Sequence, residues 1–222
     1  VDGGGFLESM GGAFAPVEGD NIEDFDHRRE HARTDWDNDG LPRPEWEALL
    51  VEMMRRADAA GHLRYALPEV VGGRGGSNLD MAVIREHLAA RGLGLHNDLQ
   101  NETSVVGNFP FILMMLAKGT EAQQAEFIDG AFNRTHLVAF GLTEPGHGSD
   151  ATFLDTKAVR RGGSWVINGT KRFNTGMHRA THDMVFARTG GAAGDADGIT
   201  CFIVPTATAG VKIGTYWWTF NM

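Results

Sequence analysis

The sequence predicts an α+β protein in which an all-helical N-terminal region precedes an antiparallel, barrel-like β-sheet. Up to about residue 134, apolar residues recur at the three- and four-residue spacing of helices. After Arg134 the apolar runs shorten to strand length, and Gly-Gly or Asn-Gly pairs separate them. With 222 residues, 42% of them hydrophobic, the chain is long enough for one large or two modest domains with real cores.

We divide the chain into three parts. Residues 1–24 are acidic and glycine-rich with little periodicity, which is typical of a flexible tail. Residues 25–134 form the helical domain, and residues 135–222 form the β domain, which we expect to be incomplete at its C-terminal end. An unfinished sheet would leave an open edge, so we expect these residues to belong to a longer polypeptide.

Four helices are predicted in the first domain. The clearest spans 44–61, where six apolar residues from Trp46 to Ala57 share one face and a glycine ends the helix. Helical spacing resumes over 77–92, an apolar helix follows over 103–117, and the capping-box pattern Thr120 to Gln123 opens a fourth helix. The glycine-rich stretch 68–76 lacks the Lys-Ser/Thr ending of a P-loop, so we interpret it as a loop where two backbones approach closely.

The β domain is predicted to contain a hairpin. Asn168-Gly169 lies between two short β-type runs, and this pair favours a type I′ turn because both central residues need a positive φ. The predicted strands are 136–143, 164–167, 171–174, 184–188, 200–205 and 211–217.

Composition excludes several classes of protein. The lone Cys201 lies in an apolar run and is interpreted as a small buried residue, so no disulfide framework or cysteine-based metal site is expected. The histidines are scattered without a metal-binding spacing, so no metal is expected. Basic residues are not interleaved with aromatic residues, which argues against nucleic acid. No apolar run reaches the length of a membrane span and no signal segment is evident, so we predict a soluble, unexported, cytoplasmic protein.

Charge is uneven along the chain. The net charge is −9, yet residues 151–190 hold seven Lys or Arg against two Asp. This excess is consistent with an anionic ligand and equally with a solvated face of strands, and charge alone leaves both open.

The stretch TEPGHGSDA at 143–151 contains a G-x-G-x-x-A pattern. In a dinucleotide-binding fold these glycines open a helix whose N-terminal amides hold the pyrophosphate. Residues 152–160 have no helical apolar face, and Pro145 indicates an irregular loop at the end of a strand. We therefore reject the dinucleotide interpretation, although the loop can still offer backbone N–H groups and hydroxyls to a bound group.

Several motifs together resemble the flavin-binding middle domain of acyl-CoA dehydrogenases. They are FGLTEPGHGSD at 140–150, WVINGTK at 165–171 and FNTG at 173–176, in the family's order and spacing. Upstream, LPE at 67–69, GG at 72–73 and AVIRE at 82–86 look like the family's helical N-terminal domain. The resemblance covers roughly residues 25–222.

This resemblance implies FAD as the cofactor. The backbone amides and the Thr143 hydroxyl would meet the pyrimidine edge of the isoalloxazine, and Phe173 would stack where the family usually has a tryptophan. Ser149 would contact the cofactor or the CoA arm, or else cap its own loop. Thr175 would lie near the hydride-accepting nitrogen. The implied cofactor-binding residues are Phe140, Leu142, Thr143, Gly148, Ser149, Phe173, Asn174 and Thr175.

The resemblance further implies a substrate site that includes Ser149 and Glu102, the latter with a helix-end carboxylate as its alternative. His147 departs from the family's usual small residue, and it is either solvent-facing or close enough to the flavin to alter substrate contacts. The family's glutamate base has no counterpart in this sequence, so no catalytic residue is assigned and the base is expected beyond Met222.

The activity implied is α,β-dehydrogenation of an acyl-CoA to the 2-enoyl-CoA, as part of fatty acid metabolism. Electrons would pass to an electron-transferring flavoprotein, and the protein would be a homotetramer or a dimer, cytoplasmic or in the mitochondrial matrix of a eukaryote. Two alternatives stay open: a flavin-dependent oxidase or monooxygenase on the same scaffold, and a non-catalytic subunit of a mixed oligomer.

Overall fold

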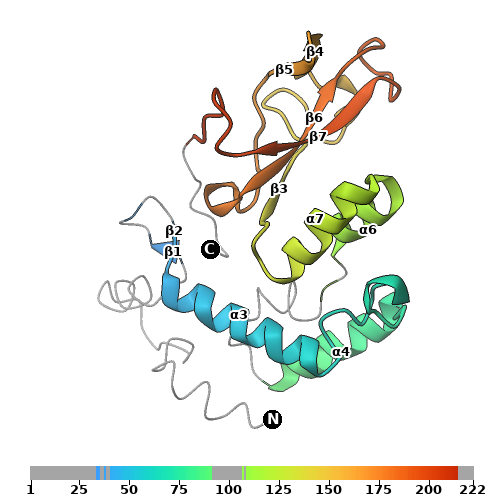
Figure 1. Ribbon diagram of the computed structural model, residues 1–222, viewed down its shortest axis with the longest axis vertical. Coiled ribbons are helices and arrows are strands. Elements are labelled where there is room, and N and C mark those ends of the chain that lie inside the picture. Colours follow the sequence, from blue (N-terminus) through green and yellow to red (C-terminus); the bar gives the residue numbers. More distant parts are fainter. Residues whose placement is uncertain (1–33, 36–37, 39–40, 92–106, 108, 215–222) are drawn as a thin grey trace. The chain divides into compact units, whose positions relative to one another are not determined.

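The computed structural model describes residues 34–35, 38, 41–91, 107 and 109–214. The chain divides into two compact units, the first comprising Val1–Gln124 with Tyr216–Met222 and the second Ala125–Thr215. Figure 1 shows the helices of the first unit and the sheet of the second. The α+β class is thus confirmed.

The first predicted helix is α3 (Pro44–Ala59), with its proline at the first helical turn and acidic residues behind it. Proline suits this position because its missing N–H has no partner there in any helix. Leu50, Met54 and Ala57 are buried, as the periodicity indicates. Two short strands, β1 (Thr34–Asp35) and β2 (Leu41–Pro42), pair antiparallel before it.

The glycine-rich stretch forms a short 3-10 turn (Glu69–Val71) and a loop between α3 and α4 (Asn78–Arg91). Helix α4 begins with a reciprocal cap, in which the Ser77 N–H donates to the Asp80 carboxylate at 2.8 Å and the Asp80 N–H donates to Ser77 Oγ at 3.2 Å. The interpretation as a loop where two backbones approach closely is confirmed, since backbone hydrogen bonds join residues 74–76 to Tyr65 and Leu67.

The last two helices are α6 (Pro110–Lys118) and α7 (Glu121–Phe132). The predicted capping box is confirmed: the Thr120 N–H donates to Gln123 Oε1 at 2.9 Å, and the Gln123 N–H donates to Thr120 Oγ1 at 3.3 Å. The start of the predicted helix 103–117 lies outside the described residues. Within the described part of the chain, no helix is both long enough and apolar enough to cross a membrane.

The second unit is built on a five-stranded sheet, and β6 (His182–Arg188) is its central strand. Strand β7 (Ile199–Pro205) pairs with it antiparallel, whereas β3 (Val138–Gly141) and β4 (Lys157–Arg161) pair with it in parallel. The sheet is therefore mixed, and the prediction of purely antiparallel pairing is wrong. Parallel pairs arise here because β3 and β6 are separated by a long connection that returns the chain to the same end.

The hairpin prediction is wrong in the position of its turn. The antiparallel hairpin joins β4 to β5 (Ser164–Asn168), with Arg161 opposite Ser164 and the turn at Gly162-Gly163. Gly162 has φ +61, a conformation that favours glycine. Gly169 is instead a close-packing position, because a Cβ there would meet the Thr156 side chain.

Other strand assignments differ as well. Strand β4 was not predicted, because its sequence KAVRR carries too much charge for an apolar run. Residues 171–174 are irregular instead of a strand, as are residues 211–214 of the predicted strand 211–217, whose remaining residues lie outside the described ones. Cys201 is exposed instead of buried, because β7 pairs with β6 alone among the described strands and forms an edge of the sheet.

The observed turn can be tested by paired substitutions. Gly162→Ala places a Cβ in the left-handed region and should lower the free energy of unfolding by about 1–2 kcal/mol. Gly163→Ala has no positive φ and open space around it, so a change of less than ~0.5 kcal/mol is expected. Urea denaturation of both variants measures this, and equal effects would show that the turn does not depend on Gly162.

Candidate functional site

The loop that follows β3 carries the motif TEPGHGSDA. Residues 142–150 are irregular, and only a three-residue 3-10 turn, Ala151–Phe153, follows. A backbone turn closes the loop, with the Glu144 N–H donating to the His147 carbonyl at 3.0 Å. The rejection of a dinucleotide-binding turn is confirmed, because no helix begins here to offer its N-terminal amides.

Glu144 forms a buried ion pair with Lys171. Lys171 Nζ donates to Glu144 Oε1 at 2.8 Å, and both side chains are less than a tenth exposed. The Glu144 carboxylate also accepts the N–H groups of Asp155, at 2.6 Å, and Thr156, at 2.9 Å. All of these donors meet one carboxylate, so protein groups compensate its charge.

The surroundings of Glu144 keep it ionised. Burial alone would raise the pKa of this carboxyl, but the Lys171 ammonium and the Thr156 and Asp155 donors outweigh burial and lower the pKa to about 2. Glu144 is therefore ionised over the whole neutral range.

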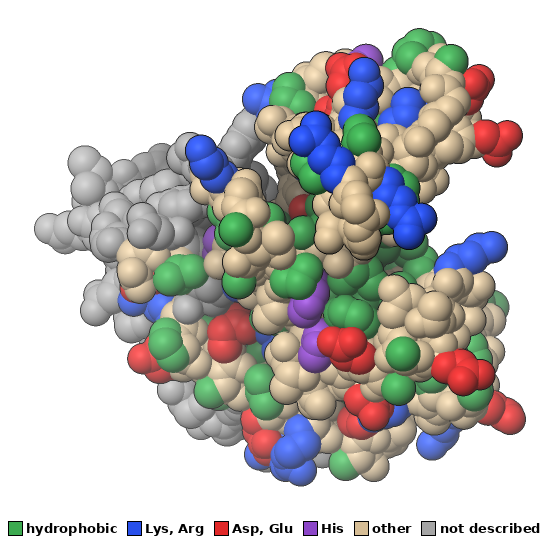
Figure 2. All heavy atoms as spheres, turned by 45° about the horizontal axis from the view of Figure 1, so that its top comes forward, with side chains coloured by type: hydrophobic (Ala, Val, Ile, Leu, Met, Phe, Trp, Pro, Cys, Tyr) green, Lys and Arg blue, Asp and Glu red, His purple; other side chains and the backbone are tan. Residues whose placement is uncertain are grey.

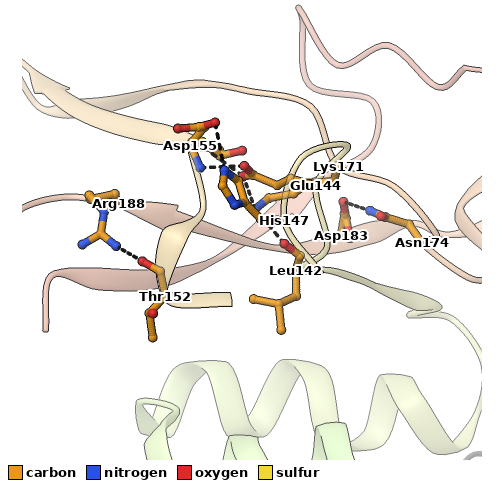
Figure 3. A network of polar contacts seen from close by, with 10 residues as sticks. Leu142, Glu144, His147, Thr152, Asp155, Lys171, Asn174, Asp183 and Arg188 are labelled. Carbon is orange, nitrogen blue, oxygen red and sulfur yellow. Dashed lines mark hydrogen bonds and ion pairs between the residues drawn. The ribbon is translucent and has the colours of Figure 1, made fainter. Parts of the chain in front are cut away.

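The same lysine joins two segments that are distant in sequence. Lys171 Nζ donates to the Leu142 carbonyl at 3.1 Å, and the Arg172 N–H donates to the Thr143 carbonyl at 2.8 Å. Figure 3 shows Leu142, Glu144 and Lys171 gathered in one polar network. The strand-end loop and the segment after β5 are thus held side by side, which brings Leu142 and Thr143 next to the residues before Phe173.

Asn174 is hydrogen-bonded to the central strand of the sheet. Its Nδ2 donates to Asp183 Oδ2 at 2.8 Å, and Asp183 is buried on β6. Figure 3 shows this pair beside the Glu144–Lys171 network. Asn174 therefore holds its segment against the sheet, and its position behind the loop argues for a supporting role.

Two aromatic rings of the predicted set are exposed. Phe140 is 49% exposed and contacts the Phe186 ring at a centroid distance of 5.1 Å, while Phe173 is 62% exposed. Phe173 also has φ +62, which is unfavourable for a bulky residue, and the Arg172 guanidinium lies 5.5 Å from its ring centroid. Strained backbone at an exposed aromatic residue is typical of a ligand-binding position.

Three hydroxyls of the predicted set make no hydrogen bond to another described residue: those of Thr143, Ser149 and Thr175. Other threonines of this unit are bonded, for example Thr152 to Asp150 and Thr206 to Ala180. Ser149 therefore does not cap its own loop. Exposed rings together with unpartnered hydroxyls fit an aromatic ligand with a polar edge, and FAD meets that description.

The basic excess of residues 151–190 does not form one patch. Lys171 is buried in its ion pair, and Arg188 is buried where its guanidinium donates to the carbonyls of Thr152, Gly190 and Asp195. The exposed cations that remain include Lys157, Arg160, Arg161 and Arg172. Figure 2 shows Lys and Arg side chains (blue) on the surface of the sheet unit.

His147 is partly enclosed. Its Nε2 lies 3.3 Å from Asp155 Oδ2, its ring stacks on Phe153 at 6.4 Å, and its side chain is 29% exposed. Asp155 and Phe153 thus hold the His147 side chain in place. The structure describes no contact between His147 and the residues around Phe173.

Sequence reasoning missed Glu144, Lys171 and Asp183. A carboxylate and a lysine embedded in glycine-rich motifs were a usable signal, because charged residues in such loops are rarely buried without a partner. Glu102 lies outside the described residues, so its substrate assignment stays a prediction. Gly148 lies exposed on the loop with open space around it, which leaves room for close approach of a ligand.

Models of two domains of one enzyme family together match most of the chain. Residues 24–134 match the acyl-CoA dehydrogenase N-terminal domain, and residues 139–222 match the acyl-CoA dehydrogenase middle domain. The chain belongs to the acyl-CoA dehydrogenase family.

Curated relatives include enzymes named for oxidation and for reduction. The chain is 32% identical over 163 residues to the mitochondrial isobutyryl-CoA dehydrogenase of Dictyostelium discoideum, covering 73% of this chain and 38% of the relative. It is 33% identical to the 3-(aryl)acrylate reductase of Clostridium sporogenes, with 73% and 42% covered. It is 29% identical to the caffeyl-CoA reductase-Etf complex subunit CarC of Acetobacterium woodii, with 73% and 41% covered. The chain spans about two fifths of the length of the curated relatives it matches.

Solved structures of the family agree with the fold. The glutaryl-CoA dehydrogenase of Mycobacterium smegmatis superposes with a TM-score of 0.58 at 31% identity, covering 82% of this chain and 42% of that one. A glutaryl-CoA dehydrogenase from the same organism in complex with FADH2 gives a TM-score of 0.54 at 28% identity, covering 72% and 38%.

The buried ion pair makes a prediction about stability. Glu144→Gln leaves the Lys171 ammonium buried without its counter-ion, so the free energy of unfolding at pH 7 should fall by about 3 kcal/mol. The folded-state pKa of Glu144 lies below its ordinary value, so the wild-type advantage is complete above pH 4.5 and disappears as pH falls towards about 2. Urea denaturation of both proteins across this pH range measures it.

A matched control is Glu52→Gln, which removes an exposed carboxylate paired with Arg55 and Arg56 on α3. We expect a much smaller loss there, because water replaces the lost partner. The double variant Glu144→Gln with Lys171→Met should recover part of the loss, since no unpaired charge remains. A loss no larger than that of Glu52→Gln would contradict the role assigned to this pair.

Proposed function

We propose that the chain is the helical and flavin-binding part of an FAD-dependent acyl-CoA dehydrogenase. One observation carries the proposal: the exposed Phe140 at the end of β3 and the exposed Phe173 lie in the same unit as three hydroxyls that have no hydrogen-bond partner among the described residues. A buried ion pair holds the loop after β3 beside the segment that leads to Phe173. An enzyme that needs no ligand here would gain nothing from exposed rings and strained backbone at this position.

The candidate residues have different roles in binding the cofactor. Phe140 and Phe173 offer apolar surface to the ring system and exclude water from it. Thr143 and Thr175 donate hydrogen bonds to its polar edge, and Gly148 and Ser149 approach the phosphate-bearing arm. When bound, FAD would accept a hydride from the carbon β to the thioester, and the donors that meet the ring would stabilise the charge that it gains.

The proposed reaction of the whole protein is α,β-dehydrogenation of an acyl-CoA to the 2-enoyl-CoA. Proton and hydride must leave neighbouring carbons in one aligned geometry, so a carboxylate base opposite the flavin is required. We place this base outside the present residues and assign Ser149 and Glu102 to the substrate. Transfer of electrons to an electron-transferring flavoprotein and a homo-oligomeric state are further parts of the proposal, and the relative from Acetobacterium woodii, named as part of an Etf complex, supports the first.

FAD binding is tested at Phe173. Phe173→Leu keeps an apolar side chain but removes the ring, so stacking worth about 0.5–1.5 kcal/mol is lost and the Kd for FAD should rise about two- to tenfold. Phe173→Trp should bind FAD at least as tightly as the wild type, because the ring is larger. Quenching of flavin fluorescence measures both, and equal affinities for Leu and Trp would show that the ring does not stack.

The reaction is tested on the complete flavin-loaded polypeptide. Anaerobic addition of a panel of acyl-CoAs should bleach the visible flavin band with one class of acyl chain, and fast reoxidation on admitting air would instead point to an oxidase. Because two of the relatives are named reductases, the reduced protein should also be mixed with 2-enoyl-CoAs. A bound flavin that no acyl-CoA or enoyl-CoA affects would refute the proposed activity.

A further inference from the structure

A second buried carboxyl lies behind the candidate site. Asp183 is 5% exposed on the central strand β6, with Ala139 of β3 and Val204 of β7 as its cross-strand neighbours. Neither neighbour offers a polar side chain. The carboxyl therefore depends on the segment 173–175 for its hydrogen bonds.

The contacts of Asp183 are incomplete for a carboxylate. Asn174 Nδ2 donates to Asp183 Oδ2 at 2.8 Å, while Asp183 Oδ1 and Asn174 Oδ1 are both buried without a hydrogen-bond partner among the described residues. Two buried acceptors facing no donor would each cost free energy. A proton on Asp183 turns one of these acceptors into the donor that the other needs.

We propose that Asp183 is kept as a neutral carboxylic acid that pairs with the Asn174 amide through two hydrogen bonds, and that it positions the segment Phe173–Thr175. The acid O–H donates to the amide oxygen while the amide N–H donates to the acid carbonyl. Atoms and charge balance, because the pair contains one proton more than the ionised carboxylate, and water supplies that proton. This accounts for both orphaned oxygens with a single proton.

The backbone leaves room for this pair. A Cβ on Gly141 would lie 2.7 Å from Asp183 Oδ2 and 2.9 Å from both Asn174 Nδ2 and Asp183 Oδ1, so the pair packs directly on the Gly141 Cα. Gly141 stands between Phe140 and Leu142. The acid and the amide thus support the strand end from beneath, at the point where it enters the candidate site.

Burial favours the neutral form of Asp183, whereas the neighbouring Lys171 charge favours the ionised form. Burial raises the pKa of this carboxyl, and the Asn174 hydrogen bond and the Lys171 charge offset burial only in part. Lys171 donates to Glu144 and to the Leu142 carbonyl, so its charge is compensated elsewhere. Cys201 on β7 is the other titratable side chain that interacts with Asp183 electrostatically, and its thiol carries no positive charge to hold a carboxylate.

The consequence for the cofactor rests on the proposed function. A flavin that gains a hydride gains negative charge. An ionised carboxylate next to the segment that contacts the flavin would oppose that change. A neutral acid fixes the Phe173–Thr175 segment with two hydrogen bonds and adds no charge. Ionising Asp183 should therefore lower the reduction potential of the bound flavin.

Infrared spectroscopy of the wild-type chain at neutral pH tests the protonation state directly. A carbonyl band of a protonated carboxylic acid is expected, which Asp183→Asn removes and Asp197→Asn, at an exposed carboxylate, leaves unchanged. The band should shift in Asn174→Leu, which removes the amide partner. If no protonated-acid band is present in the wild type, the carboxyl is ionised and the proposal is overturned, whether or not FAD binds.

Stability against pH gives a second readout. The folded-state pKa of Asp183 is raised, so its contribution is complete below the unfolded value of 3.8 and is lost as pH rises through the folded-state pKa. Asp183→Asn keeps an amide pair and has no such loss, so its melting temperature should rise relative to wild type as pH increases. Asp183→Ala should be less stable than Asp183→Asn at every pH. A constant difference between Asp183→Asn and wild type across this range would contradict a retained proton.

Discussion

The buried Glu144–Lys171 pair is the interaction on which the rest of the sheet unit depends. It joins residues 27 positions apart in the sequence and makes the loop after β3 lie against the segment after β5. Neither segment has regular secondary structure, so neither could satisfy its backbone groups alone. The carboxylate accepts two backbone N–H groups and the lysine donates to a carbonyl, and together they replace the ladder that a strand would have supplied.

This arrangement explains why exposed apolar surface survives on the same loops. Phe173 carries a positive φ and an exposed ring, which a mobile loop would relieve by moving. The chain on both sides of it is held: Lys171 and Arg172 are bonded to the first loop, and Asn174 is bonded to β6. Within the segment after β5, strain and exposure thus coincide at Phe173, and the surrounding polar contacts offset their cost.

The parts that the sequence predicts well are those governed by local rules. Helix α3 follows from its apolar period, and α7 follows from the Thr120 capping box. The predictions fail where a contact between residues distant in the sequence determines the local structure. Asn168-Gly169 is a good hairpin pair, yet Gly169 is needed against Thr156 and the turn moves to Gly162-Gly163. The parallel pairing of β3 with β6 depends on a connection of about forty residues and leaves no local signal. In the candidate site, the aromatic and hydroxyl residues were assigned by resemblance and stay a prediction, whereas the ion pair behind them was not predicted.

The two buried carboxyls of this unit reach opposite charge states for one physical reason. Glu144 meets an ammonium and two backbone N–H groups, and enough donors to replace its hydration keep it ionised. Asp183 meets one amide N–H, which cannot compensate a full charge in a dry environment, so the proton is retained instead. Charge is therefore present where it joins two loops and absent behind the segment Phe173–Thr175. An ionised residue at the second position would fix the segment equally well, and the difference between the two is felt only when the bound group changes its own charge.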